Sequence, residues 1–388
     1  MRYKNFFNLL LSASLMIFFT FSCEKDNPGA DNGDNNGDNN TGFSNEDVSE
    51  WIYQWMNTIY LWNDQIPDDL NPANESNPVS FFYSLLYEEE DIWSFITDDW
   101  EAFKAELSGT PLSMGYSPAF GRFSNSDGVF IIVEYVTPNT PASEAGLERG
   151  DIIISIDETP LDTSNFRDLY NQESYTAGLA YYNGSSLTPT GETIELTASV
   201  ISSSPVIHHE VINFQDRKIG YLVYVDFLSG LNDFLVDQLD EVFSTFADSA
   251  VDELIVDLRY NPGGEVSMAS YLASCIAPSS VVNSTNVLVS YVYNNDLYDL
   301  FLQEGGSNSS DLKLFFTTPT VNLDMQNVYF MTTSGTASAS ELVITGLDPY
   351  MDVTVVGETT FGKYTGAWVF PDTETPPRHN FAIVPIVL

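Results

Sequence analysis

Ser338 and Lys363 form a pair that is suited to nucleophilic catalysis. Ser338 lies in the segment Thr336-Ala337-Ser338-Ala339-Ser340-Glu341, and Lys363 follows 25 residues later. A serine hydroxyl becomes a good nucleophile when a neighbouring base takes its proton. The chain has only three histidines in 388 residues, so a lysine is the available base. The pair therefore predicts a hydrolytic site in which Lys363 activates Ser338.

Ser338 also fits a purely structural role. The sequence Ser338-Ala339-Ser340-Glu341 is typical of a capping box, in which the serine and glutamate side chains accept the first N–H groups of a helix. The start of a helix equally favours a developing oxyanion, because its free N–H groups and its dipole present positive charge. Both interpretations predict a helix that begins here, and this segment alone does not decide between them.

A second group of backbone donors is expected at Gly263, in the string that runs from Leu254 to Gly264. The string reads as a buried strand that ends in a glycine pair, and glycine lets a backbone N–H approach a ligand oxygen without an intervening side chain. We expect the N–H groups of Gly263 and Ala339 to form an oxyanion hole. The alternative is an ordinary turn between a strand and a helix.

Lys363 lies in the segment Gly357 to Tyr364, which differs by one residue from the phosphate-binding pattern G-x-x-x-x-G-K-[ST]. We reject a phosphate site, because Tyr364 replaces the metal-binding hydroxyl and a strand-like stretch follows where a helix is required. As a base, Lys363 needs a pKa lowered from about 10.4 to about 7 to 8. Burial among apolar neighbours such as Phe361 and Trp368 would lower it. The alternative is a solvated surface lysine.

The elements that position these residues alternate between strands and helices after Asp216. This alternation predicts an α/β core. The expected strands are Ile219 to Val225, Leu254 to Leu258, Val328 to Met331 and Val353 to Val356, and the expected helices cover Leu235 to Phe246, Val266 to Ile276 and Ser338 to Leu347.

A helical module is expected before this core, over residues 44–106. Apolar residues from Val48 to Ile59 recur at the spacing of one helical face, after a cap at Ser44. Further helical stretches are expected from Val79 to Tyr87 and from Ile92 to Phe103. The tryptophans of this module are expected to lie in a hydrophobic core rather than in a ligand cage.

Residues 107–200 carry short strands around the pattern P-x-x-P-A-x-x-A-G-L-x-x-G-D-x-I, which begins at Pro138. This order resembles a PDZ domain. A PDZ groove adds an extended peptide as a strand and holds its terminal carboxylate in a nest of backbone N–H groups. We place that nest at Met114, Gly115 and Tyr116. The alternative is a small β module without a peptide ligand.

The first 22 residues have the pattern of an export signal: two basic residues precede an apolar run that ends at Phe21, and Cys23 follows. The run is too short for a membrane span, and the cysteine favours a lipoprotein signal. We predict a signal peptide over residues 1–22, lipidation of Cys23, and a flexible polar linker over residues 23–43. The expected location is the cell envelope, periplasmic or at the surface of the outer membrane. The alternative is a signal peptide with an incidental cysteine.

The net charge of −42 argues against nucleic acid as a partner. With Cys23 lipidated, Cys275 is the remaining cysteine, so no disulfide is expected, and its apolar neighbours predict a buried, inert thiol.

These segments together resemble the C-terminal processing (tail-specific) protease family, whose members join a PDZ domain to a serine-lysine core of the crotonase/ClpP-like α/β type. The strings Leu254 to Gly264, Thr336 to Glu341 and Thr360 to Lys363 stand in the family's order, and the 25-residue spacing matches. The segment Trp51 to Pro67 is similar to the N-terminal module of lipoprotein members from Bacteroidetes.

The resemblance implies that Ser338 is the nucleophile and Lys363 the general base, with Gly263 and Ala339 as the oxyanion hole. Glu341 matches a carboxylate that orients the lysine or caps the helix. Some members have a glutamine four residues after the lysine, where this chain has Ala367, so the third partner stays open. No cofactor or metal is implied.

We therefore predict an extracytoplasmic serine endopeptidase, whose core spans residues 201–388 and whose PDZ domain binds the C-terminal segment of a peptide or protein substrate. The alternative is a non-catalytic peptide-binding lipoprotein on the same scaffold. The chain stops within the apolar segment Phe381 to Leu388, from which we expect a truncated core. The sequence indicates neither the substrate nor the oligomeric state.

Overall fold

The structure is a computed structural model that describes residues 16–18, 43–124, 126–283 and 285–388. The predicted signal peptide, Cys23 and the linker lie outside the described residues, except for residues 16–18 and residue 43. Contacts divide the chain into two units, of which the second contains residues 104–208 and 229–238 and the first contains the rest. The domain boundaries proposed above stay predictions.

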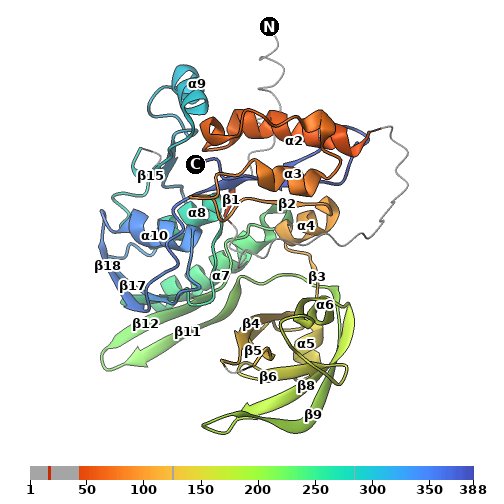
Figure 1. Ribbon diagram of the computed structural model, residues 1–388. Coiled ribbons are helices and arrows are strands. Elements are labelled where there is room, and N and C mark those ends of the chain that lie inside the picture. Colours follow the sequence, from red (N-terminus) through yellow and green to blue (C-terminus); the bar gives the residue numbers. More distant parts are fainter. Residues whose placement is uncertain (1–15, 19–42, 125, 284) are drawn as a thin grey trace. The chain divides into compact units, whose positions relative to one another are not determined.

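A five-stranded sheet forms the centre of the first unit (Figure 1). The strands β12, β13, β17 and β18 run parallel to one another in that spatial order, and β11 lies beside β12. Leu222, Val256 and Phe330 are fully buried, as expected for a parallel sheet covered on both faces. The bounds are β11 Val206–Phe214, β12 Arg217–Tyr224, β13 Glu253–Asp257, β17 Asn327–Thr332 and β18 Asp352–Gly357.

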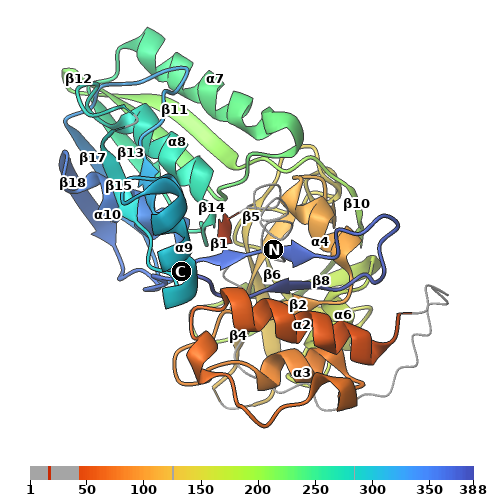
Figure 2. The same cartoon turned by 90° about the horizontal axis from the view of Figure 1, so that it is seen from above.

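Three helices connect successive parallel strands, and all three confirm the alternation predicted from the sequence. They are α7 Phe234–Ser249, α8 Val266–Ile276 and α10 Ala339–Leu347. The predicted apolar face of α7, from Leu235 to Phe246, is buried. Helices α8 and α10 pack against each other (Figure 2). Between α8 and β17 lie β15 Val287–Ser290, α9 Asn295–Gly305 and β16 Lys313–Phe315.

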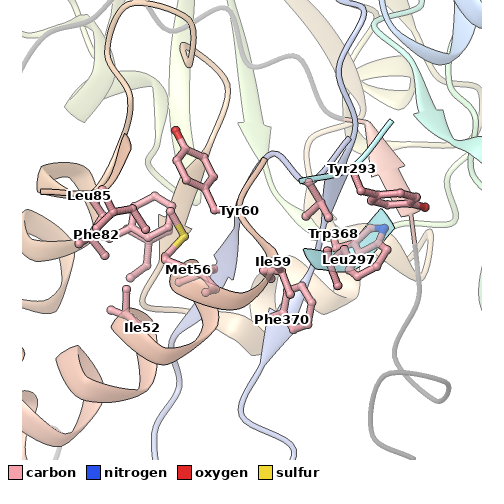
Figure 3. Packing of buried hydrophobic residues seen from close by; sticks show 14 of the residues in the cluster. Ile52, Met56, Ile59, Tyr60, Phe82, Leu85, Tyr293, Leu297, Trp368 and Phe370 are labelled. Carbon is pink, nitrogen blue, oxygen red and sulfur yellow. The ribbon is translucent and has the colours of Figure 1, made fainter. Parts of the chain in front are cut away.

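The N-terminal helices pack into the same hydrophobic core as the C-terminal strands. Ser44 caps α2 (Asn45–Ile59) in a capping box with Asp47, and α3 (Pro78–Ser84) lies beside α2. Figure 3 shows Ile52, Met56 and Ile59 of α2 in one cluster with Trp368 and Phe370. The helical segment and the later strands therefore stabilise each other. Short 3₁₀ turns follow α2 at Asn63–Gln65 and Pro72–Asn74.

The helix predicted from Ile92 to Phe103 is wrong in its first half. Residues Phe95–Thr97 form strand β2, and a helix, α4, covers Trp100–Leu107. The partner of β2 is β21 (Ala382–Val384), almost three hundred residues later, and β20 (Phe370–Pro371) pairs on the other side of β21. A strand that depends on such a distant partner has no local periodicity from which it can be predicted.

The second unit contains a six-stranded antiparallel sheet around a separate apolar core. Its strands confirm the predicted order of short strands, and β4 lies at one edge. The helices are α5 Pro141–Glu144, α6 Phe166–Tyr170 and a 3₁₀ turn at Leu231–Asp233. The strands are β3 Leu112–Ser113, β4 Tyr116–Arg122, β5 Val129–Val136, β6 Ile152–Ile156, β7 Thr159–Pro160, β8 Ser174–Tyr182, β9 Leu187–Thr197 and β10 Ser199–Val200, with β3 and β10 paired separately.

Within the described residues, no helix combines the length and apolar character needed to cross a bilayer.

Candidate active site

Three loops at the carboxyl edge of the parallel sheet carry the predicted catalytic residues. Gly263 follows β13, Ser338 follows β17 and Lys363 follows β18. Because β17 lies between β13 and β18, the topology brings all three loops to one edge. In open α/β sheets this edge is where ligands bind.

Ser338 occupies a strained position at the start of α10. Its φ is 61° and its ψ is −114°, a conformation that costs a non-glycine residue on the order of 1–3 kcal/mol. The residue is 3% exposed, and the hydroxyl forms no hydrogen bond with any described residue. A strained turn with a buried hydroxyl that lacks a partner is typical of a nucleophile rather than of a simple helix cap.

Glu341 connects the serine to the loop that carries the lysine. Its Oε2 accepts hydrogen bonds from the N–H groups of Ser338, at 2.7 Å, and Lys363, at 2.9 Å, and its Oε1 accepts one from Gly362, at 2.7 Å. Glu341 therefore caps α10 and also holds the backbone of Lys363. The other half of the capping box, a bond to the Ser338 hydroxyl, does not form.

The side chain of Lys363 is buried, with 4% of the residue exposed. Burial lowers the pKa of Lys363 to about 7, although the negative charges of Asp91 and Glu341 oppose this change. Holding the amine in this environment costs about 5 kcal/mol relative to water. Trp368 is 3% exposed, as predicted. Phe361 is 43% exposed, so the prediction that it helps to bury Lys363 is wrong.

Gly263 lies directly against the start of α10. A Cβ at Gly263 would lie 2.8 Å from the Cβ of Ser338 and 3.1 Å from the backbone nitrogen of Ala339. The structure thus brings together the two backbone donors predicted for the oxyanion hole. The N–H of Ala339 is donated to no described residue, but that of Gly263 is donated to Asn261 Oδ1 at 2.9 Å.

A short strand runs beside these loops. Residues Met16–Phe18 form β1, which pairs antiparallel with β14 (Gly264–Glu265) on one side and β19 (Ala367–Trp368) on the other. The first residue of β14 follows Gly263 directly, and Ala367 lies four residues after Lys363. The backbone edges of β14 and β19 can therefore hold an extended segment at the site.

Asp91 is the residue near the lysine that sequence analysis missed. It is 1% exposed and lies between α3 and β2. The charge of Asp91 raises the pKa of Lys363, and this effect is larger than the effect of the charge of Glu341. In the sequence it ends the run Glu88-Glu89-Glu90-Asp91, which looks like a solvated acidic surface. Only the apolar Ile92 and Trp93 that follow hint that one carboxylate turns inward.

The remaining predicted residues lie elsewhere. Met114, Gly115 and Tyr116 precede and begin β4 of the second unit, where the N–H of Gly115 is donated to Ser113 Oγ at 3.0 Å. Cys275 is buried in α8, as predicted, and burial raises the pKa of its thiol. Cys23 lies outside the described residues.

Three segments of the chain match models of known protein families. Residues 218–375 match the model of peptidase family S41, residues 47–95 match that of the peptidase S41 N-terminal domain, and residues 132–170 match a PDZ domain.

Curated relatives are C-terminal processing enzymes. The carboxyl-terminal-processing peptidase 2 of Arabidopsis thaliana, a chloroplast protein, is 26% identical over 269 residues, covering 66% of this chain and 45% of that protein. The carboxyl-terminal-processing protease of Synechocystis is 25% identical over 264 residues, covering 66% and 53%. The chain thus spans about half the length of the curated relatives it matches.

Solved structures share the fold. A Bacteroides fragilis protein described as an S41 protease has a TM-score of 0.68 and 26% identity, over 87% of this chain and 84% of that one. The photosystem II D1 C-terminal processing protease has a TM-score of 0.51 and 17% identity, over 89% and 87%, which shows the fold alone. The predicted fold class is confirmed, and residues 218–375, together with the N-terminal residues 47–95, belong to peptidase family S41.

Proposed function

We propose that the chain is a serine endopeptidase in which Ser338 is the nucleophile and Lys363 the general base. One observation carries the proposal: a single oxygen, Oε2 of Glu341, accepts the N–H groups of both residues. This carboxylate fixes the loop of the base against the strained turn of the nucleophile. A shared anchor of this kind is what a reaction between two separate loops requires.

In the proposed reaction the neutral amine of Lys363 takes the proton of the Ser338 hydroxyl as Oγ attacks the carbonyl carbon of a peptide bond. The tetrahedral intermediate collapses when the C–N bond breaks, and the Lys363 ammonium gives its proton to the leaving amine. Water then hydrolyses the ester on Ser338, again with Lys363 as the base. A pKa of about 7 leaves much of the amine neutral near physiological pH.

The N–H of Ala339 is available to the oxyanion, whereas that of Gly263 first has to leave Asn261 Oδ1. We infer that a substrate carbonyl oxygen replaces Asn261 as its acceptor. The charge on an oxyanion makes it a stronger acceptor than a neutral amide oxygen, which favours the exchange in the transition state.

The pairing of β1 supports an extended peptide as the substrate. The edges of β14 and β19 accept a strand next to Gly263. If residues 1–22 are removed as a signal peptide, a substrate strand can bind there by the same backbone hydrogen bonds.

The second unit is proposed to bind the C-terminal segment of the substrate along the edge of β4. A peptide with a free carboxylate should then bind at least about tenfold more tightly than the same peptide amidated, because only the carboxylate uses the N–H nest. Fluorescence polarisation with the two peptides measures this difference. Equal affinities would remove Met114, Gly115 and Tyr116 as the carboxylate nest.

The location remains a proposal from the N-terminal sequence: a lipid anchor on Cys23 in the cell envelope. Metabolic labelling with a fatty acid tests it, since Cys23→Ala should abolish the label and Cys275→Ala should not.

Cleavage of an unfolded protein by the purified chain tests the catalytic assignment. Ser338→Ala and Lys363→Ala are each expected to abolish cleavage, with circular dichroism unchanged. Ser340→Ala is the matched control, because Ser340 is also a buried serine at the start of α10. Cleavage that survives in either of the first two variants refutes the dyad.

The alternative, a peptide-binding protein without catalysis, is favoured by one observation: the N–H of Gly263 is occupied by Asn261. A fluorophosphonate probe separates the two functions, since it forms a stable bond only with an activated serine. Labelling of the wild type that is lost in Ser338→Ala supports the peptidase. Peptide binding without any labelling supports the alternative.

A further inference from the structure

The N-terminal segment carries a buried carboxylate, Asp91, that the proposed reaction does not use. Three donors hold it: Oδ2 accepts the Tyr60 hydroxyl at 2.8 Å, and Oδ1 accepts the N–H groups of Trp93 at 3.0 Å and Ser94 at 2.9 Å. Both carboxylate oxygens are therefore fixed by the protein. A buried charge with this many donors is an organised feature rather than a chance surface aspartate.

Tyr60 keeps Asp91 in place from the end of α2. Its side chain is fully buried in the apolar cluster of Figure 3, and its hydroxyl also accepts the N–H of Tyr87 at 2.9 Å. Burial and the charge of Asp91 raise the pKa of Tyr60 well above its usual range, so the hydroxyl stays protonated. Tyr60 thus remains a donor to the carboxylate at any physiological pH.

The segment around Asp91 packs on the loop of Lys363. The ring of Trp93 contacts that of Tyr364 edge to face, with centroids 6.1 Å apart, and the Tyr364 hydroxyl donates to Glu90 Oε2 at 3.4 Å. These contacts lie on both sides of Asp91 in the sequence, and they reach the residue directly after Lys363.

Among the described residues, the charges that act on Lys363 are those of Asp91 and Glu341, whereas Glu90 contacts only the neighbouring Tyr364. Glu341 accepts hydrogen bonds from three backbone N–H groups, and their positive ends partly offset its negative charge. When Lys363 takes a proton it becomes a buried ammonium, which is unfavourable unless a negative charge faces it. Asp91 supplies such a charge from outside the protease loops.

We propose that Asp91 is a positioning residue for Lys363: its fixed carboxylate stabilises the ammonium that forms when Lys363 takes the proton of Ser338. The inference rests on the proposed function. It assigns the N-terminal segment a part in the active site in addition to its packing. The proton itself moves only between Ser338, Lys363 and the leaving amine.

The pKa of Lys363 can be measured without any reaction. The chain has six lysines, so protein labelled with ¹³C at lysine Cε gives few NMR signals, and the signal absent from Lys363→Met is that of Lys363. In Asp91→Asn, which keeps the shape of the side chain, the pKa of Lys363 should fall from about 7 to about 6 or lower. The matched control is Glu90→Gln, which changes an exposed carboxylate one residue away and should leave the pKa of Lys363 unchanged.

Kinetics provide the second measurement. The acid limb of the pH profile of kcat/KM should move to lower pH in Asp91→Asn by the same amount as the NMR pKa. At pH 8, kcat should fall about three- to tenfold, because Lys363 becomes a weaker base. A loss of activity with an unmoved acid limb would mean that Asp91 is only structural, and an unchanged NMR pKa would overturn the proposal.

Tyr60→Phe keeps the inference testable if Asp91→Asn does not fold. This variant leaves the charge of Asp91 but removes one of its donors, so the pKa of Lys363 should rise, and an unchanged or lower value counts against the proposal.

The proposed function and the inference about Asp91 are refuted by different results. If Ser338→Ala cleaves like the wild type, the peptidase assignment fails, whereas the NMR titration still decides whether Asp91 acts on Lys363.

Discussion

The parallel strands have polar residues at both ends, at their amino ends (the amino edge) and at their carboxyl ends (the carboxyl edge). The two edges differ in whether the buried polar groups have hydrogen-bond partners. At the amino edge, Glu253, Asn327 and Asp352 line a cavity of about 620 Å³, and Glu253 contacts both Asn327 and Arg217. Among the described residues, the amino edge has no buried side-chain donor or acceptor without a partner.

At the carboxyl edge, by contrast, several buried polar groups have no hydrogen-bond partner among the described residues. The hydroxyls of Tyr224, Ser338 and Thr365 are buried without a partner among the described residues, and Ser338 also has a strained backbone. A folded protein keeps such features only where surrounding packing enforces them. The comparison teaches that strain and unpartnered buried groups mark the candidate site here, whereas the polar-lined cavity at the amino edge does not.

Among substitutions that leave Ser338 and Lys363 in place, the largest expected effect is that of a methyl group at Gly263. Gly263→Ala places a Cβ 2.8 Å from that of Ser338, at a φ of 118° that alanine disfavours. Cleavage should fall by about a thousandfold or more, because the oxyanion hole is displaced. The control is Gly362→Ala, which has a φ of 90° but nothing within 4 Å of the added carbon. It should lower the free energy of unfolding by only about 1 kcal/mol.

Equal loss of activity in the two glycine variants would mean that backbone strain, rather than the contact with Ser338, determines the effect.

Lys363→Met should stabilise the fold while abolishing catalysis. The pKa of Lys363 is about 7 in the folded chain and about 10.4 when unfolded, so between these values the unfolded state binds more protons. Stability of the wild type therefore rises with pH across this window. At pH 7 the variant should be more stable by about 2–4 kcal/mol, and near pH 10 the gain should disappear.

Thermal unfolding of the wild type and Lys363→Met across this pH range measures the gain. At the amino edge, Arg217→Met is the comparison, because the Arg217 side chain is 64% exposed and should show no such dependence. A gain that is independent of pH would show that the buried amine is not the cause.

Glu341→Gln should have an intermediate effect. A glutamine has one carbonyl oxygen in place of the two that bind Ser338, Gly362 and Lys363, so at least one backbone N–H loses its acceptor. The free energy of unfolding should fall by about 1–3 kcal/mol. The rate of cleavage should fall as well, with KM nearly unchanged, because the loop of Lys363 is released. A large rise in KM alone would place Glu341 in substrate binding instead.

The sequence was sufficient to predict the four parallel strands of the sheet, because each is an apolar run with a clear end, but not β11, whose segment contains His208, His209 and Glu210. It also placed Gly263, Ser338 and Lys363 after three separate strands, which the structure shows to be neighbours. It could not predict β2, whose partner is distant, or Asp91, whose burial depends on Tyr60. Nor could it predict that Asn261 occupies the N–H of Gly263, because side-chain hydrogen bonds are set by packing.

The smallest expected effect belongs to Glu253 at the amino edge. Glu253→Gln removes the charge that faces Arg217, but the Arg217 side chain is largely exposed, and such pairs contribute about 0–1 kcal/mol. The new amide still offers an oxygen to Asn327. Cleavage should stay within about twofold of the wild type, although Glu253 lines the cavity at the amino edge. If Glu253→Gln instead reduced cleavage as strongly as Glu341→Gln, the amino edge would have to hold a ligand of its own. Buried polar groups without a partner would then no longer distinguish the edge that carries the active site from the edge that does not.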